Sequence, residues 1–255
     1  MRKKFRFQHF SLHKLTTIIC FLICHVAFSQ SEADSALYNQ SLKNVNAFYK
    51  NEIKENLHLY AGNEYVKPSA LGQKVNGFPY FLSDSLLEGS IYYDGSFYNG
   101  VSIHYQIFNE KLIVNVPFYN TLIELHNEKI KFFFIGHHEF LKIPPDAASA
   151  LHTNKLYYER LYSGQETLWA IREKRFILSA KAEDQSANYF EYDQYFLEKG
   201  SAFYTVGSKK ELLNALSDRK AELKKFIRQN KLKFKNETES SLIKAIQYYD
   251  QTKNF

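Results

Sequence analysis

Apolar and polar residues alternate with a period of two through the middle of the chain. The alternation is clearest where Val101, Ile103, Tyr105 and Ile107 are separated by polar side chains, which is typical of a half-buried β-strand. Short polar turns separate similar runs, so consecutive strands are expected to be antiparallel neighbours. The further runs that predict strands are 90–93, 111–116, 121–125, 129–135, 139–143, 157–162, 167–178, 189–197 and 202–206.

Two glycine turn signals lie unusually close together in this region. Asp94-Gly95 and Asn99-Gly100 are separated by only three residues, too few for an independent strand between two tight turns. We therefore expect one of the two to be a hairpin turn and the other a glycine bulge, without deciding which.

The period changes to three or four residues at both ends of the chain. Residues 31–59 predict a moderately amphipathic N-terminal helix. Ser208 and Glu211 form a capping box ahead of Leu212, Leu213 and Leu216, which predicts a helix start. The fold class is therefore α+β and β-rich. It combines a mostly antiparallel curved sheet or open barrel of about ten strands with an N-terminal helix and a helical C-terminal segment.

The first 29 residues have the composition of a cleavable export signal. A basic stretch without acidic residues precedes the run 15–28, which contains no Lys, Arg, Asp or Glu and ends in Ala27-Phe28-Ser29. A 14-residue run is short for a bilayer span, although an uncleaved anchor is the alternative. Cleavage would leave about 226 residues with neither cysteine, hence no disulfides and no transmembrane span.

These patterns divide the chain into four segments. They are the signal (1–29), an N-terminal helical segment (30–62), a β-rich domain (63–207), and a basic helical C-terminal segment (208–255) expected to pack on the β-rich domain. The signal contains five of the 33 Lys and Arg residues and no Asp or Glu, so the mature chain is nearly neutral. The overall charge of +6 therefore gives no reason to expect a nucleic-acid partner.

The remaining positive charge is concentrated in one place. Ten basic and three acidic residues lie between Ser208 and Lys235. One interpretation is a binding surface for an anionic envelope surface or an acidic protein partner. The alternative is an ordinary solvated helix face. The candidate binding residues are Lys220, Lys224, Lys225 and Arg228.

Residues with catalytic chemistry are scattered rather than arranged in a motif. The candidates are Asp94, His104, His137 and Glu139. If 137–139 lie on a strand, His137 and Glu139 share one face and His138 points away. Two ligands do not make a metal site, so we predict no metal and no cofactor. The chain also lacks a G-x-S-x-G elbow and a phosphate-binding glycine loop.

Several stretches together resemble a family of uncharacterised exported proteins from Bacteroidota. They are 77–81 (GFPYF), 90–95 (SIYYDG) with Val101, 136–137 (GH), 206–213 (VGSKKELL), 224–234 (KKFIRQNKLKF) and 248–250 (YYD), with the junction 27–30 (AFSQ). The resemblance covers most of the mature chain and brings no activity or site residues with it. It implies a Gram-negative envelope, with the protein in the periplasm or at the periphery of the outer membrane.

The sequence therefore predicts an exported, non-catalytic binding or structural module of the cell envelope. Two alternatives stay open. A carrier of apolar ligands would use the many Tyr and Phe side chains to line a cavity, where the competing interpretation places these rings in the core. A hydrolase acting on envelope polymers would need titratable side chains that converge in a cleft.

Overall fold

The computed structural model describes residues 37–45, 47, 58–67, 74–117, 119, 121–143, 153–180 and 186–253. The chain divides into two compact units, residues 1–55 and residues 56–255. In the first unit, residues 37–45 are helical, in agreement with the predicted N-terminal helix. The predicted signal, 1–29, lies outside the described residues. No helix in the described part of the chain combines the length and the hydropathy needed to cross a membrane.

Eleven described strands of the second unit form one antiparallel sheet. The sheet is open, with β1 and β14 as its edges, so the predicted mostly antiparallel, unclosed sheet is confirmed. Its strands, in spatial order, are β1 (Asn63–Glu64), β6 (Thr121–Glu124), β5 (Lys111–Val116), β4 (Ser96–Gln106), β3 (Leu87–Tyr93), β7 (Ile130–Ile135), β8 (His138–Leu141), β9 (Tyr158–Ser163), β10 (Thr167–Ile171), β13 (Gln194–Lys199) and β14 (Ala202–Thr205).

The two glycine turn signals have different roles. Asp94 and Gly95 both have positive φ and form the tight turn between β3 and β4. Gly100 also has positive φ, but it lies inside β4, where the register against β3 shifts between Gly89 and Ile91. The first signal is therefore the hairpin turn and the second is the bulge.

One predicted neighbour relationship is wrong. The short connection after residue 125 predicts that β6 and β7 pair, but β6 lies between β1 and β5, while β7 pairs with β3 and β8. The connection contains a 3₁₀ turn, η1 (Asn127–Lys129), that distant segments hold in place. The Asn127 side chain donates to the Glu110 carbonyl oxygen and accepts from the Tyr157 hydroxyl. Beyond this turn, β7 lies on the other side of the β3–β4 hairpin from β6.

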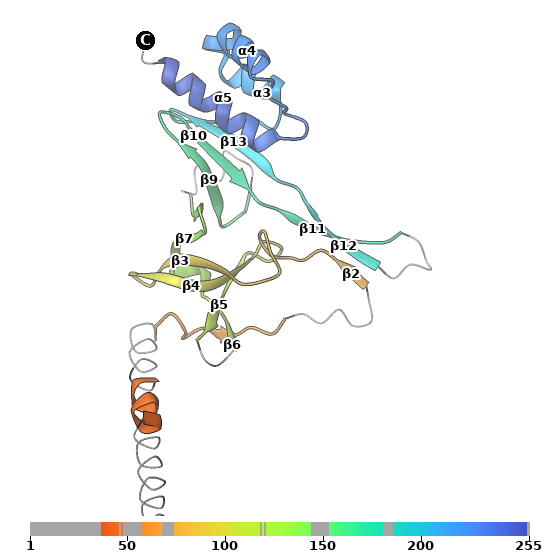
Figure 1. Ribbon diagram of the computed structural model, residues 1–255. Coiled ribbons are helices and arrows are strands. Elements are labelled where there is room, and N and C mark those ends of the chain that lie inside the picture. Colours follow the sequence, from red (N-terminus) through yellow and green to blue (C-terminus); the bar gives the residue numbers. More distant parts are fainter. Residues whose placement is uncertain are drawn as a thin grey trace, which may run out of the picture. The chain divides into compact units, whose positions relative to one another are not determined.

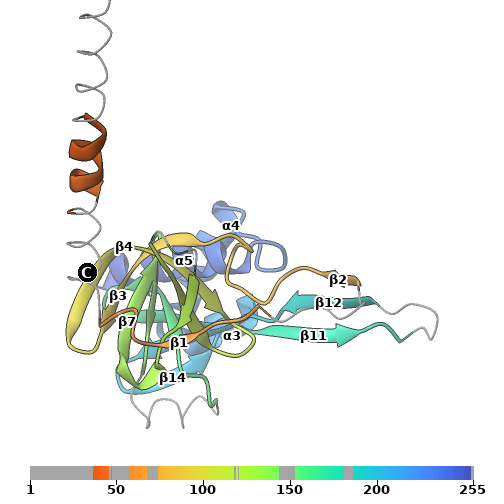
Figure 2. The same ribbon diagram turned by 90° about the horizontal axis from the view of Figure 1, so that it is seen from below.

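Two predicted long strands are each divided in the structure. The run 167–178 becomes β10 and β11 (Lys174–Leu178), and the run 189–197 falls into β12 (Ser186–Glu191) and β13. β11 and β12 leave the large sheet and form a second sheet with β2 (Lys74–Asn76), which pairs parallel to β12. Figures 1 and 2 show β11 and β12 extending side by side from the rest of the unit. No Gly or Pro marks either break, so the pattern alone does not reveal it.

The C-terminal segment folds into helices that pack on one end of the large sheet (Figure 1). The helices are α3 (Lys209–Ala215), α4 (Lys220–Gln229), preceded by the 3₁₀ turn η2 (Ser217–Arg219), and α5 (Thr238–Lys253). Leu168 of β10 and Leu197 of β13 share a buried cluster with Leu212, Leu223 and other side chains of the three helices. Burial of this apolar surface stabilises the helices against the sheet.

Aromatic side chains fill the core of the large sheet. Tyr105 and Tyr157 are each 2% exposed, and both contact Phe133, whose ring stacks on Phe140 with 4.8 Å between centroids. These rings therefore occupy the core, as the competing interpretation of the aromatic residues expected.

Candidate functional site

The basic residues of the C-terminal segment gather where α3 begins and along α4. The N-cap of α3 is Ser208, whose hydroxyl oxygen accepts a hydrogen bond from the Glu211 backbone N–H at 3.3 Å. This is one of the two hydrogen bonds of the predicted capping box, and the Glu211 carboxylate accepts from the Ser208 hydroxyl at 2.9 Å. The cap precedes the first turn of α3, which contains Lys209. On α4, Arg228 follows Lys224 by four residues and Lys225 by three, which makes these three side chains neighbours on the helix surface.

A hollow of about 530 Å³ lies between this face of α4 and the first turn of α3. The apolar residues that line it are Ala221, Ile227 and Leu232, and the other lining residues are cationic. We call this hollow the basic hollow. The cations that line it are Lys209, Lys224, Lys225, Arg228 and Lys231. Three of the four predicted binding residues, Lys224, Lys225 and Arg228, therefore lie together.

The cations of the basic hollow have no carboxylate partner among the described residues. The ion pairs of this region use other cations: Lys199 with Asp218, Arg219 with Glu222 and Lys233 with Glu237. Four of the five lining cations are exposed and Lys209 is half-buried. The hollow therefore carries uncompensated positive charge, which favours an anionic ligand.

Lys220, the fourth predicted binding residue, lies in a different place. Its ammonium donates to the Asn214 side-chain oxygen at 3.1 Å, and it lines a second hollow of about 330 Å³. The other residues around that hollow are Lys209, Lys210, Leu213 and Asn214. Selection of α4 residues by charge alone missed Lys231 and the Lys209 contribution from α3. Lys231 follows the end of α4 and has positive φ, so the helical spacing of α4 does not predict its position.

The four predicted catalytic candidates do not converge. Asp94 lies on an exposed turn and forms an ion pair with Lys129 at 2.9 Å. His104 is buried in β4, with its ring stacked on Tyr80. His137 is exposed in the turn before β8. Glu139 pairs with Arg160 through both carboxylate oxygens at 2.7 and 2.8 Å. Within the described part of the chain, no hydrogen bond or ion pair joins any two of the four.

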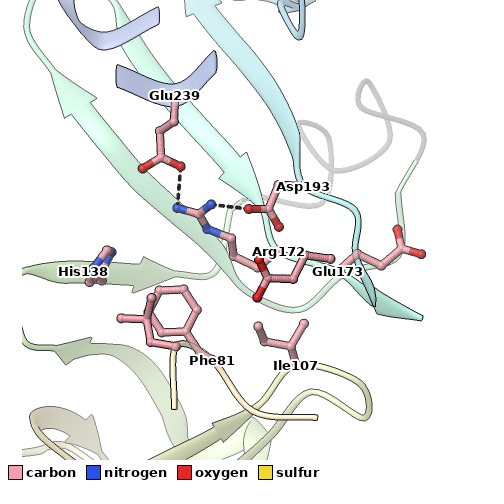
Figure 3. Close-up of a pocket in the computed structure, with 9 residues that line it drawn as sticks. Phe81, Ile107, His138, Arg172, Glu173, Asp193 and Glu239 are labelled. Carbon is pink, nitrogen blue, oxygen red and sulfur yellow. Dashed lines mark hydrogen bonds and ion pairs between the residues drawn. The ribbon is translucent and has the colours of Figure 1, made fainter. Parts of the chain in front are cut away.

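A second charged centre lies where the two sheets separate. A cavity of about 150 Å³ opens there beside Arg172, the residue that follows β10. Figure 3 shows the Arg172 guanidinium between Glu239 and Asp193, with Phe81 and Ile107 also lining the cavity. The other lining residues are Leu82, His138, Glu173 and Glu191.

Arg172 is held by three carboxylates from different parts of the chain. Its Nε lies 2.5 Å from Glu159, its Nη2 lies 2.8 Å from Glu239, and its Nη1 donates to Asp193. Burial alone would lower the pKa of the guanidinium, but these carboxylates raise it above its ordinary value. Burial also raises the pKa of Asp193, although Arg172 opposes that shift. All three guanidinium nitrogens are occupied, so Arg172 links β9, the β12–β13 connection and α5.

His138 contacts the same network, although the sequence placed it away from the candidate site. Its Nδ1 lies 2.5 Å from Glu159, whose side chain is 2% exposed. Burial tends to raise the pKa of Glu159, but His138 and Arg172 together hold it below its ordinary value. The imidazole also lines the cavity. The sequence signal for this centre is the charged stretch 172–175 (REKR), which interrupts the apolar residues of the run 167–178.

The described residues contain no group of three or more His, Cys, Asp or Glu side chains placed to hold a metal ion. Comparison of the chain with protein-family models, with curated proteins and with solved structures finds no match in any of the three. The evidence for function therefore comes from the residues and geometry of this chain.

Proposed function

We propose that this protein is an exported, non-catalytic module of the cell envelope that binds an anionic surface through the basic hollow. One observation carries the proposal: Lys209, Lys224, Lys225, Arg228 and Lys231 line one hollow, and no described carboxylate pairs with them. The predicted export signal, residues 1–29, supports a location in the periplasm or at the periphery of the outer membrane.

Electrostatics supports this proposal over that of an ordinary solvated face. Like charges at helical spacing repel one another, which costs about 0.2–0.5 kcal/mol per pair. An external anionic surface would relieve this repulsion. A Lys or Arg near an anionic membrane contributes about 1 kcal/mol of binding free energy. A cluster of this size would therefore bind measurably at low ionic strength, and salt would weaken the binding.

The test is cosedimentation of the purified protein with vesicles that contain phosphatidylglycerol, at low and physiological salt. The double variant Lys224→Glu/Arg228→Glu should bind at least tenfold more weakly. The matched control is Lys235→Glu/Lys244→Glu, which makes the same charge change at two exposed lysines of the C-terminal segment that lie outside the basic hollow. Equal binding by wild type and the first variant would refute the proposal.

A second candidate function is acid–base catalysis at His138, and one observation favours it. A buried carboxylate, Glu159, orients the ring, and the same ring lines a cavity. This is the arrangement of an oriented general base. A panel of chromogenic esters, phosphoesters and glycosides would test it. Turnover that is lost in His138→Gln and kept in His137→Gln would support catalysis, whereas equal rates in both would oppose it.

The carrier alternative has less support in the described part of the chain. An apolar ligand would require a large cavity lined by apolar or aromatic side chains. Each of the three hollows considered above includes charged side chains in its lining.

A further inference from the structure

The basic hollow and the second hollow adjoin each other at Lys209, which lines both. The first lies between the N-terminal turn of α3 and α4. The second is bordered by α3 residues and by Lys220, the first residue of α4. A ligand that reaches past Lys209 would therefore contact both hollows, whose linings differ in chemistry.

The lining of the second hollow combines one aliphatic side chain with three lysines. Leu213 is 7% exposed and packs in the core cluster of the helices, and Lys209, Lys210 and Lys220 line the hollow beside it. Lysine side chains commonly lay their methylene groups along apolar surface while the ammonium stays in water. The Lys220 ammonium is directed to the Asn214 oxygen. The residues that line this hollow include neither a carboxylate nor an aromatic ring.

We propose that the two hollows together bind one anionic amphiphile, with its phosphate headgroup in the basic hollow and the start of its acyl chain in the second. This inference rests on the proposed function and specifies its ligand as an anionic lipid. The positive charge of the basic hollow favours a phosphate headgroup there. Because Lys209 lines both hollows, the acyl chain attached to that headgroup would reach the second hollow. A purely polar polyanion would use the basic hollow and gain nothing from the Leu213 surface.

The test measures the affinity of a series of n-alkyl phosphates, from ethyl to octyl, for the purified protein by calorimetry below their micelle concentrations. Each methylene that becomes buried should tighten binding about twofold to fourfold. Alkyltrimethylammonium ions of the same chain lengths serve as the charge control, and we expect no measurable binding of them.

Two variants test where the alkyl chain of the ligand binds. Asn214 is exposed beside the second hollow, so Asn214→Trp should fill the hollow without a change of charge. The gain in affinity with chain length should disappear in this variant, while the affinity for ethyl phosphate changes less than threefold. Asn236→Trp changes an exposed residue that lines neither hollow and should behave as wild type. Circular dichroism would verify that both variants are folded.

The outcomes separate this inference from the proposed function. If ethyl phosphate binds and chain length has no effect, the lipid inference is overturned while anion binding stands. An equal chain-length gain for the ammonium series, or an undiminished gain in Asn214→Trp, would also overturn the lipid inference. If no alkyl phosphate binds and anionic vesicles do not bind either, both proposals fall.

Discussion

The Arg172 guanidinium lies 2.8 Å from a carboxylate oxygen of Glu239, and this ion pair joins the end of β10 to the first turn of α5. The side chain of Arg172 is 9% exposed, and its other ion pairs are with Glu159 and Asp193. One guanidinium therefore connects the large sheet, the point where the second sheet departs and the C-terminal helices.

Replacement of Arg172 by Met should destabilise the protein strongly. Removal of one partner from a buried ion-pair network leaves uncompensated charge and typically costs about 3–5 kcal/mol. Urea unfolding would measure the loss. The control is Arg175→Met, because Arg175 is 52% exposed and its ion pair within the described part of the chain is with the neighbouring Glu173. It should cost less than about 1 kcal/mol. Comparable losses in the two variants would contradict a central role for Arg172.

His104 should make the stability of the protein depend on pH. Burial, with a contribution from the positive charge of Lys67, lowers its pKa below the ordinary value of 6.5, and Asp84 opposes the shift. A lowered pKa favours the neutral imidazole in the folded state. The resulting stabilisation is present above pH 6.5 and is lost as the pH falls through the folded-state pKa.

The variant His104→Phe keeps an aromatic ring against Tyr80 and removes the titrating group. Unfolding free energies measured between pH 5 and pH 8 should fall toward acid more steeply for wild type than for this variant. Parallel curves would show that His104 does not contribute to the pH dependence.

Two glycines in the same hairpin should differ in their tolerance of alanine. A Cβ at Gly89 would lie 2.2 Å from the Phe134 carbonyl oxygen of β7 and 2.6 Å from Ile103. A Cβ at Gly100 meets nothing within 4 Å, and only the positive φ of 64° opposes it. Gly100→Ala should therefore cost about 1–2 kcal/mol, and Gly89→Ala should cost more because backbone atoms must move. Thermal unfolding would rank them, and the reverse order would contradict this close approach of β3 and β7.

Ser208 should contribute a measurable part of the stability of α3. Its side chain accepts from the Glu211 N–H, and loss of such a cap typically costs about 1 kcal/mol. Ser208→Ala should show this loss in urea unfolding, while Ser208→Asp should restore most of it because a carboxylate accepts the same hydrogen bond. Equal stability of wild type and Ser208→Ala would show that the cap does not stabilise the helix.

Charge and periodicity along the sequence predict part of the proposed binding site. The sequence located the basic segment, and three of its four selected residues line the basic hollow. Lys220 lies apart from them, and its ammonium donates a hydrogen bond to the Asn214 side chain. Lys209 joined them because packing of α3 and α4 on a shared apolar cluster brings the start of one helix to the face of the other. Neither effect is visible in the order of charges along the chain.

The sequence by itself determined the local structure: the strands with a period of two, the turn and bulge around Asp94-Gly95 and Gly100, and the capped start of α3. These features depend on residues within a few positions of one another. Only the tertiary structure decided that β7 pairs with β3 rather than β6, that two strand runs break beside Arg172 and Asp193, and that His138 contacts Glu159. These outcomes depend on partners far away in the chain, which a local pattern of polar and apolar residues does not specify.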